Sequence, residues 1–212
     1  MTPEPSRHCP LCSRLVEYRI ANAVAEPDWF NGAVPSFGAA DAKLLIVGLA
    51  PGVTGANRTG RPFTGDHAGV LLYGMLLRHG FAQGAYDARS DDDLVLVGCM
   101  ITNAVRCVPP ANKPTPAEVR TCTRFLVDRI ASLHHLTHIL ALGRVAHDAT
   151  LTALGLKRSA YAFGHGARHA LPDGRVLADS YHCSRYNTNT GVLTEAMFDM
   201  VFADLRRDIA IT

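Results

Sequence analysis

The sequence predicts an α/β fold, in the form of a three-layer α/β/α sandwich around a central, mainly parallel sheet of four strands. Two observations lead to this class. Four short apolar runs are typical of strands buried on both faces, and segments with helical periodicity alternate with them along the chain. Parallel strands are joined by crossover helices, so this alternation predicts helices on both faces of the sheet. A length of 212 residues suits one core, and we expect a single domain at residues 1–212.

The predicted elements begin with a helix at residues 13–25. An irregular connection follows at residues 26–40, because this stretch contains two prolines and two glycines. Another helix is expected at residues 67–79. The apolar runs that predict the four strands are residues 43–48, residues 94–98 with a continuation at 101–102, residues 138–143 and residues 175–179.

The helix expected at residues 116–133 has a well-marked start. Thr115 can cap it, Pro116 suits the first helical position, and Glu118 places negative charge near the positive end of the helix dipole. The fourth apolar run ends just before His182, which brings that histidine to the end of a predicted strand.

Charge and hydropathy restrict the class of protein only broadly. The 21 Lys and Arg residues against 19 Asp and Glu residues give a formal net charge of +2, so affinity for nucleic acid must come from local basic patches. The N-terminus has no apolar region of the kind found in secretory signals, and no stretch approaches the roughly 20 apolar residues that span a bilayer. We therefore expect a soluble, cytoplasmic protein with no membrane contact.

Four of the six cysteines have a spacing that suggests metal ligands. Cys9 and Cys12 form a C-x2-C pair, and fourteen residues separate Cys107 from Cys122. Four thiolates hold either zinc or an iron–sulfur cluster, and the alternative is that they are ordinary buried thiols. The second pair is too widely spaced for a usual zinc ribbon, which favours a [4Fe-4S] cluster. The other two cysteines lack paired spacing and are not expected to be ligands: Cys99 and Cys183.

A glycine-rich loop at residues 48–66 follows the first predicted strand. Its glycines allow the backbone to approach a ligand closely, as in a phosphate or nucleotide cradle. However, the loop lacks both the Lys-Ser/Thr ending of a P-loop and the G-x-G-x-x-G fingerprint of dinucleotide-binding folds. The two commonest nucleotide-binding assignments are therefore weak.

The sequence of this loop, GLAPGVTGANRTGRPFTGD, resembles the first motif of family 5 uracil-DNA glycosylases, to which family 4 is related. Residues 102–107, TNAVRC, resemble the second motif, and residues 182–191, HCSRYNTNTG, resemble the His-containing motif with the DNA-insertion loop. The order of the four cysteines also matches the cluster of the family. Two positions depart from the pattern, with Thr54 in place of a histidine and Cys183 in place of a proline.

The resemblance implies the fold, the activity and the cofactor. It implies a monofunctional enzyme that hydrolyses the N-glycosidic bond of uracil in DNA, together with other deaminated bases such as hypoxanthine, and leaves an abasic site. It also implies that the protein is a monomer whose partner is DNA. The [4Fe-4S] cluster would be held by four ligands: Cys9, Cys12, Cys107 and Cys122.

The chemistry of base excision assigns roles to four residues. A glycosylase flips its target base into a pocket, where Phe63 can stack on the base and Asn103 can hydrogen-bond its edge. His182 suits a donor to the leaving base. Asp66 either caps the following helix or supports the sugar cation and orients the attacking water. For Phe63, Asn103 and His182 the alternatives are ordinary core, capping and surface roles.

Further residues are expected around the pocket. In the resembling families, backbone amides near Ala50 and Gly52 supply fixed dipoles, and we expect the same here. Basic side chains on the same loops can contact phosphates, although each can equally be a solvated surface charge. Tyr186 can enter the duplex as a wedge when the base leaves, or pack on the surface. The expected phosphate contacts are Arg58, Arg61 and Arg185, and Arg106 and Lys113 lie on the same predicted loops.

Two other classes of function remain open. An iron–sulfur electron carrier would use the four cysteines alone, and it gives no reason for Asn103 and His182 to lie at strand ends beside a glycine-rich loop. A zinc-stabilised nucleotide-binding module would bind without catalysis. Metal analysis together with a base-release assay separates these possibilities.

Overall fold

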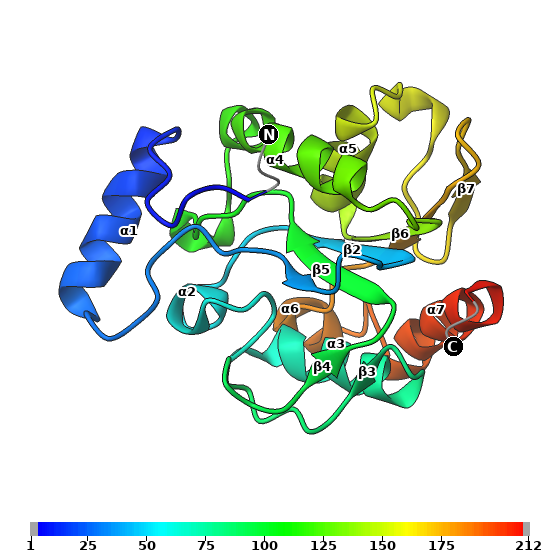
Figure 1. Cartoon of the computed structure of the whole chain (residues 1–212), viewed down its shortest axis with the longest axis horizontal. Helices are drawn as coiled ribbons and strands as arrows, with labels where there is room; N and C mark the ends of the chain where they lie inside the picture. Colours follow the sequence, from blue (N-terminus) through cyan, green and yellow to red (C-terminus); the bar gives the residue numbers. More distant parts are fainter. Residues whose placement is uncertain (1–3, 210–212) are drawn as a thin grey trace.

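A six-stranded sheet separates two layers of helices (Figure 1). The structure is a computed structural model that describes residues 4–209. The strand order is β1-β5-β2-β6-β8-β7, and the four central strands are parallel to one another. The predicted α/β/α class with a mainly parallel sheet is therefore confirmed. The central strands are β2 (Leu44–Gly48), β5 (Cys99–Asn103), β6 (His138–Leu142) and β8 (Val176–Ser180).

The sheet is larger than the four strands predicted. Two short antiparallel strands close its edges, namely β1 (Phe37–Gly38) beside β5 and β7 (Arg168–Ala170) beside β8. Strand β1 lies within residues 26–40, which were predicted to be irregular. Strands of two and three residues are too short to show the alternation that marks a strand in a sequence.

The second predicted strand is in fact two strands. Gly98 has a φ of +61°, which a glycine adopts readily, and it interrupts the apolar run. Strand β4 (Val95–Leu96) precedes this turn and pairs with β3 (Ala82–Gln83) in a separate two-stranded ribbon. Only the part after the turn, β5, joins the main sheet.

The helices cover both faces of the sheet (Figure 1). Helices α3 and α7 contact one another, as do α4 and α5, on opposite faces. The predicted helix at residues 13–25 is confirmed, and the other two each end one residue earlier than predicted. The helices are α1 (Ser13–Ala25), α2 (Ala56–Thr59), α3 (His67–Arg78), α4 (Pro116–Ser132), α5 (Arg144–Ala153), α6 (Arg185–Asn189) and α7 (Glu195–Asp208), with short 3₁₀ turns η1 (Pro110–Asn112) and η2 (Arg158–Ala160).

The core lies on both sides of β2, because successive side chains of a strand point to opposite faces. Leu44 and Ile46 pack with residues of α3 and α7, whereas Leu45 and Val47 pack with residues of α4 and α5. All four side chains are fully buried. This explains why β2 reads as a continuous apolar run rather than an alternating one.

The carboxyl ends of the parallel strands meet at one edge of the sheet. Gly48, the last residue of β2, lies in register with Asn103, the last residue of β5. Strand β8 ends at Ser180, two residues before His182. Ligand crevices in open α/β sheets form at this edge. Within residues 4–209, no helix has the length and apolar character needed to cross a membrane.

A buried ion pair connects α5 to β8. His147 and Asp179 are both fully buried, and the Nδ1 atom of His147 lies 2.8 Å from Asp179 Oδ1. The Nε2 atom of His147 lies 3.0 Å from the carbonyl oxygen of Tyr161. Because both ring nitrogens face acceptors, both carry protons. Burial by itself lowers the pKa of His147, but the hydrogen bond and charge of Asp179 outweigh burial and raise this pKa.

The raised pKa predicts how stability depends on pH. A histidine whose pKa is higher in the folded protein stabilises the fold fully below its unfolded pKa of about 6.5, and this contribution is lost as the pH rises through the folded pKa. Urea unfolding between about pH 6 and pH 9 should show this loss in the wild-type protein but not in His147→Gln. Asp179→Ala should cost about 3–5 kcal/mol because it leaves a buried charge unpaired. Parallel pH profiles for wild type and His147→Gln would contradict the assignment.

Candidate active site

A cavity of about 480 Å³ opens at the carboxyl edge of the sheet. The loop after β2, the start of α3 and the segment after β8 form most of its lining. These segments bring together five residues that the sequence singled out, although they are far apart along the chain. The five residues are Ala50, Gly52, Asp66, His182 and Arg185.

The two carboxylate oxygens of Asp66 have different surroundings. Oδ1 accepts a hydrogen bond of 3.1 Å from the backbone N–H of Gly69 and so caps α3. Oδ2 lies against the glycine-rich loop. If Gly55 carried a Cβ atom, that atom would lie 2.4 Å from Oδ2, and a Cβ atom on Gly52 would lie 3.1 Å from it. Capping therefore uses one oxygen and leaves the other beside Gly52, which lines the cavity.

His182 lies in the cavity lining with its ring stacked on Phe63, at 5.9 Å between centroids and 27° between planes. Its backbone carbonyl accepts a 2.8 Å hydrogen bond from Asn187 Nδ2. Burial lowers the pKa of His182, and the negative charge of Asp66 only partly opposes this effect. The imidazole is therefore neutral at neutral pH and has one N–H donor.

Gly143 lies beside His182, and its backbone conformation rather than crowding favours glycine there. A Cβ atom at this position would lie 3.4 Å from His182 Cβ, and the residue has a φ of +93°. Only glycine adopts this backbone conformation readily. Gly143 comes directly after β6, so a third strand end helps to place the histidine.

Phe63 and Asn103 meet over Gly48. A Cβ atom at Gly48 would come within 2.4 Å of Asn103 Oδ1 and 2.5 Å of Phe63 Cζ. Phe63 is buried with a φ of +53°, a conformation that costs a bulky residue about 1–3 kcal/mol. Asn103 Oδ1 is buried and has no hydrogen-bond partner among residues 4–209. A buried acceptor without a donor costs about 1–3 kcal/mol, so this oxygen is suited to a ligand N–H group.

Arg61 is a buried structural residue, and the prediction that it contacts DNA is wrong. Only 4% of it is exposed, and its two terminal nitrogens bind Asp92 at 2.6 and 2.8 Å. Its Nε atom donates to Thr64 Oγ1 at 2.8 Å. The hydrogen bonds from Arg61 lower the pKa of Asp92 to about 2, as expected for a tightly held carboxylate. Its guanidinium also lies over the rings of Phe37, Tyr73 and Tyr86.

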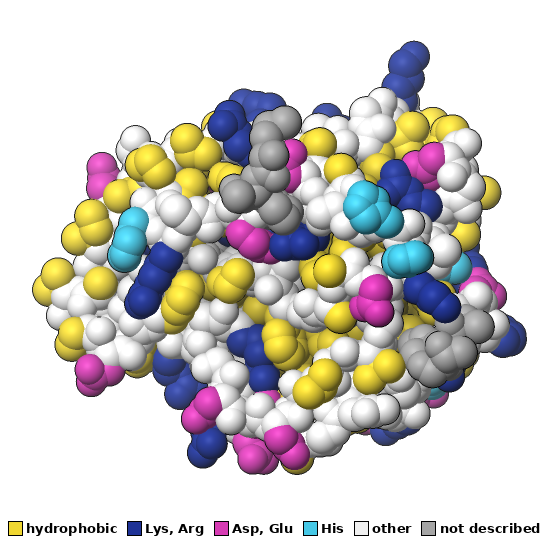
Figure 2. Space-filling view, in the orientation of Figure 1, with side chains coloured by type: hydrophobic (Ala, Val, Ile, Leu, Met, Phe, Trp, Pro, Cys, Tyr) yellow, Lys and Arg dark blue, Asp and Glu magenta, His cyan; other side chains and the backbone are white. Residues whose placement is uncertain are grey.

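Arg106 is also buried, with contacts to Glu4 at 2.9 Å and to the carbonyl of Val34 at 3.0 Å, so the suggestion that it contacts phosphates is wrong as well. The other basic candidates are exposed. On the face in Figure 2, basic and acidic side chains are interspersed, in agreement with the near-neutral net charge. The exposed residues from the predicted DNA-contact set are Arg58, Lys113, Arg185 and Tyr186.

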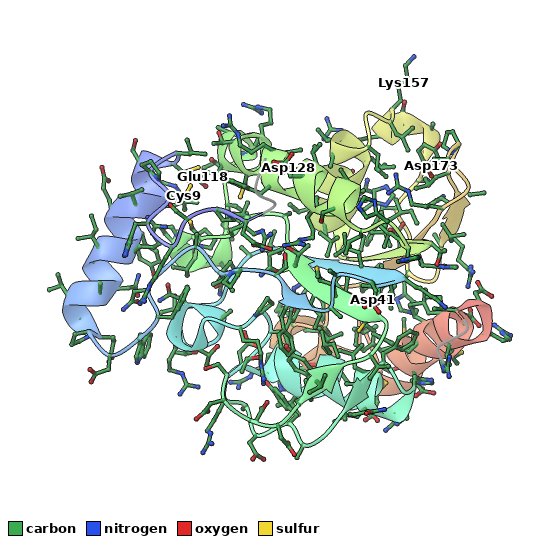
Figure 3. All side chains as sticks on the ribbon, viewed as in Figure 1. Cys9, Asp41, Glu118, Asp128, Lys157 and Asp173 are labelled. Atoms are coloured by element: carbon green, nitrogen blue, oxygen red, sulfur yellow. The ribbon has the colours of Figure 1, made fainter. Side chains whose placement is uncertain are left out.

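The four cysteines predicted as ligands line a second cavity, between α1 and α4. Figure 3 shows Cys9 in this part of the molecule. None of the six cysteines forms a disulfide. Arg19 Nη1 donates to Cys107 Sγ, and the backbone N–H of Arg106 donates to Cys122 Sγ, each at 3.4 Å. Burial raises the pKa of Cys107 to about 11 and that of Cys122 to about 12, so both are protonated without a metal.

The remaining cysteines lie elsewhere. Cys99 and Cys183 are buried in the core beside α3 and α7, and burial raises the pKa of each. A third set of possible ligand atoms comes from His147, His169 and Asp179. Because both nitrogens of His147 already bind acceptors, this set is an ion-pair network rather than a metal site.

Sequence reasoning missed several residues around the cavity. His67 and Asn112 line it, and His67 Nε2 lies 3.0 Å from Thr188 Oγ1, which ties α3 to α6. The signal for Asn112 in the sequence was weak. The residue lies in a Pro-rich stretch, where turns are expected, and asparagine tolerates the left-handed backbone of a turn. No sequence pattern indicated that Asp92 would neutralise Arg61 or that Gly143 would contact His182.

Comparisons with known proteins place the chain in a family. The model of the uracil DNA glycosylase superfamily matches residues 35–206. A protein from Thermus thermophilus named Type-5 uracil-DNA glycosylase is 46% identical over 205 residues, which cover 94% of this chain and 93% of the relative. A protein of the same name from Mycobacterium bovis is 39% identical over 208 residues, which cover 94% of this chain and 77% of that protein.

A more distant relative extends the comparison to a second type. A Type-4 uracil-DNA glycosylase from Pyrobaculum aerophilum is 36% identical over 126 residues, which cover 59% of this chain and 56% of that protein. The family match spans the glycine-rich loop, Asn103 and His182. The chain belongs to the uracil DNA glycosylase superfamily.

Proposed function

We propose that this chain hydrolyses the N-glycosidic bond of uracil in DNA and leaves an abasic site. The observation that carries the proposal is that Asp66 and His182, from distant segments, line one cavity at the carboxyl edge of the sheet. The 46% identity to a Type-5 uracil-DNA glycosylase supports the same activity. DNA that contains uracil is then the partner, and we propose that the enzyme acts as a monomer.

Phe63 and Asn103 supply the base recognition. A flipped base needs a stacking surface and hydrogen bonds to its edge. The unpartnered Oδ1 atom of Asn103 is an acceptor for the N3–H group of uracil, and the ring of Phe63 lies next to it across Gly48. Cytosine has no N–H group at N3, so a fixed acceptor at Asn103 disfavours it.

His182 and Asp66 supply the chemistry. As the bond between C1′ of the sugar and N1 of uracil breaks, its electron pair stays on the base and positive charge develops on the sugar. Neutral His182 donates its N–H to the O2 atom of the leaving uracil. The carboxylate of Asp66 stabilises the sugar cation and takes the proton of the water whose oxygen bonds to C1′. Backbone amides near Ala50 and Gly52 add fixed dipoles at the cavity wall.

The DNA backbone is contacted by exposed residues around the cavity. We assign phosphate contacts to Arg58 and Arg185, and Arg185 itself lines the cavity. Tyr186 is 74% exposed on α6, next to Arg185, and is available to fill the space that the base leaves. The near-neutral net charge means that these local residues carry the electrostatic attraction.

The four cysteines fit a [4Fe-4S] cluster better than a single zinc ion. Four thiolates around one zinc ion at 2.3 Å lie about 3.8 Å apart. Among the described residues, no three cysteine sulfur atoms come within 4.8 Å of one another. A larger cluster tolerates this spacing, and the donors to Cys107 and Cys122 Sγ suit thiolate ligands. Hydrolysis transfers no electrons, so we assign the cluster a structural role in joining the N-terminal segment to the loop after Asn103.

The substrate range extends beyond uracil in this proposal. The cavity lining includes Thr54, where related enzymes have a histidine, and this exposed residue adds little bulk. The other departure, Cys183, is buried beneath the cavity, where its thiol donates to the carbonyl of Ala68 at 3.6 Å. We propose that hypoxanthine and other deaminated bases are also excised.

The proposal predicts base release from a duplex with one U·G mismatch. Wild-type protein purified anaerobically should release uracil and leave an abasic product. His182→Ala should lower the single-turnover rate by about 10²–10³ because the leaving base loses its donor. The iron–sulfur absorbance should be the same in both proteins. A folded wild-type protein with full absorbance that releases no uracil would contradict the function, and a parallel duplex with hypoxanthine tests the wider range.

Asp66→Asn separates capping from chemistry. The asparagine side chain keeps the oxygen that accepts from Gly69, so the free energy of unfolding should change by less than about 1 kcal/mol. Loss of the negative charge should slow uracil release by about 10²–10⁴. Asp66→Ala, the matched control, should lose stability and activity together. An unchanged rate in Asp66→Asn would remove the carboxylate from the mechanism.

Cys107→Ala tests the cofactor. This variant should lose the visible absorbance of the cluster and unfold at a lower urea concentration than the wild type. Cys99→Ala is the matched control, because that buried thiol lies outside the second cavity, and it should keep the absorbance. Stoichiometric zinc in place of iron in the purified protein would contradict the iron–sulfur assignment.

A further inference from the structure

We propose that Tyr86 is a positioning residue for base recognition, whose hydroxyl holds Phe63 in the backbone conformation that places its ring next to Asn103. This inference rests on the proposed function and deepens it, because it names the group that fixes the stacking surface. Tyr86 lies in the loop at residues 84–94, between β3 and β4, and belongs to none of the three loop motifs. Strand β3 packs beside α3 (Figure 1).

The hydroxyl of Tyr86 binds the peptide groups on both sides of Thr64. It donates to the carbonyl of Phe63 at 3.2 Å and accepts from the backbone N–H of Gly65 at 3.3 Å. Burial raises the pKa of Tyr86, so the hydroxyl keeps the proton that it donates. One hydroxyl therefore fixes the backbone that leads from Phe63 to Asp66.

Phe63 and Gly65, the two residues that Tyr86 contacts, both have left-handed backbone. Their φ angles are +53° and +94°. Glycine adopts such angles readily, but a bulky residue does so only where the surrounding structure maintains them. Without a partner for its carbonyl, Phe63 would return to ordinary extended or helical backbone, and its ring would leave the place beside Asn103.

Helix α3 leaves room for these contacts at Gly69. A Cβ atom there would lie 1.7 Å from the carbonyl oxygen of Phe63 and 2.6 Å from the hydroxyl oxygen of Tyr86. No side chain fits at these distances. The backbone N–H of Gly69 also donates to Asp66 Oδ1 at 3.1 Å. The same glycine thus brings the tyrosine hydroxyl, the Phe63 carbonyl and the carboxylate of Asp66 to the first turn of one helix.

Packing holds the ring of Tyr86 in place. The ring stacks on Tyr73 at 4.5 Å between centroids and 26° between planes, and Cζ of Arg61 lies over it at 5.8 Å from the centroid. Asp92, which binds that guanidinium, also accepts a 3.0 Å hydrogen bond from the backbone N–H of Asp87, next to Tyr86. The ion pair of Arg61 and Asp92 therefore fixes the loop that carries the tyrosine.

Tyr86→Phe is the substitution that isolates the hydroxyl. It keeps the stack on Tyr73 and leaves the carbonyl of Phe63 without this donor, so the backbone there gains freedom to relax. A substitution of Arg61 or Asp92 would instead leave a buried charge unpaired and act on folding.

The test is single-turnover uracil release from the U·G duplex, measured over a range of enzyme concentrations so that the maximal rate is separated from DNA binding. Tyr86→Phe should lower the maximal rate about tenfold, because a displaced ring stabilises the flipped base less. The affinity for a uracil-free duplex of the same sequence should stay unchanged, since no base enters the pocket there.

Tyr161→Phe is the matched control. Tyr161 is half-buried like Tyr86 but packs on the side of the sheet that α4 and α5 cover, so this variant should match the wild type in maximal rate. Rates are compared at a temperature at which urea titrations show that both variants are fully folded. A loss of stability alone then leaves the maximal rate unchanged.

A double variant tests whether Tyr86 acts through Phe63. Phe63→Leu keeps an apolar side chain but has no aromatic ring to stack on a base. In that background Tyr86→Phe should lower the maximal rate by less than about twofold, because the ring that the hydroxyl positions is absent. The same loss in both backgrounds would show that Tyr86 does not act through Phe63 and would overturn the proposal.

The remaining outcomes separate this inference from the function on which it rests. If the wild type releases uracil and Tyr86→Phe has the same maximal rate, the hydroxyl is a packing contact and the inference alone is wrong. Weaker binding of the uracil-free duplex by Tyr86→Phe, with an unchanged maximal rate, also overturns it. If the wild-type protein releases no uracil, the proposed function fails first, and this inference fails with it.

Discussion

The site depends on the close approach of side chains to the backbone of the glycine-rich loop. At Gly48, Gly52 and Gly55, the missing Cβ atoms leave room for Phe63, Asn103 and the carboxylate of Asp66. Packing at these distances excludes any other residue at Gly48 and Gly55 without a shift of the neighbouring atoms. The loop therefore determines where Phe63, Asn103 and Asp66 lie, and the sheet supplies the edge on which they are placed.

Basic residues in this protein have two separate uses. Arg61 and Arg106 are buried among carboxylates, carbonyls and aromatic rings, where they join loops that lack regular hydrogen bonding. Arg58 and Arg185 remain exposed. A buried charge that loses its partner is costly, so substitutions of Arg61 or Arg106 should act on folding, whereas the proposed phosphate contacts fall on the exposed arginines.

The sequence predicted what depends on local pattern. Continuous apolar runs identified the four parallel strands, and the capping residues located the start of α4 at Pro116. It could not predict the short edge strands, whose hydrogen bonds come from partners elsewhere, or the break at Gly98. In the site, the resemblance indicated Asp66 and His182. It gave no sign that Arg61 would be buried in an ion pair with Asp92, which is 31 positions away in the sequence. Contacts of this kind leave no periodic signal.

The segment from Cys107 to Cys122 carries two predicted metal ligands and also contributes Asn112 to the lining of the first cavity. It leaves β5 at Asn103, passes through buried Cys107, exposes Asn112 at the cavity and returns to the core with α4. The turn at residues 110–112 has left-handed backbone at Ala111 and Asn112. If only one end of the segment were fixed, this backbone could relax, so the turn needs attachment on both sides. Arg14 supplies one attachment, through its hydrogen bond to the carbonyl of Lys113. A structural cluster at Cys107 and Cys122 would supply attachment on both sides. The role of the proposed cluster would then be structural, because it would fix the segment that lines the cavity.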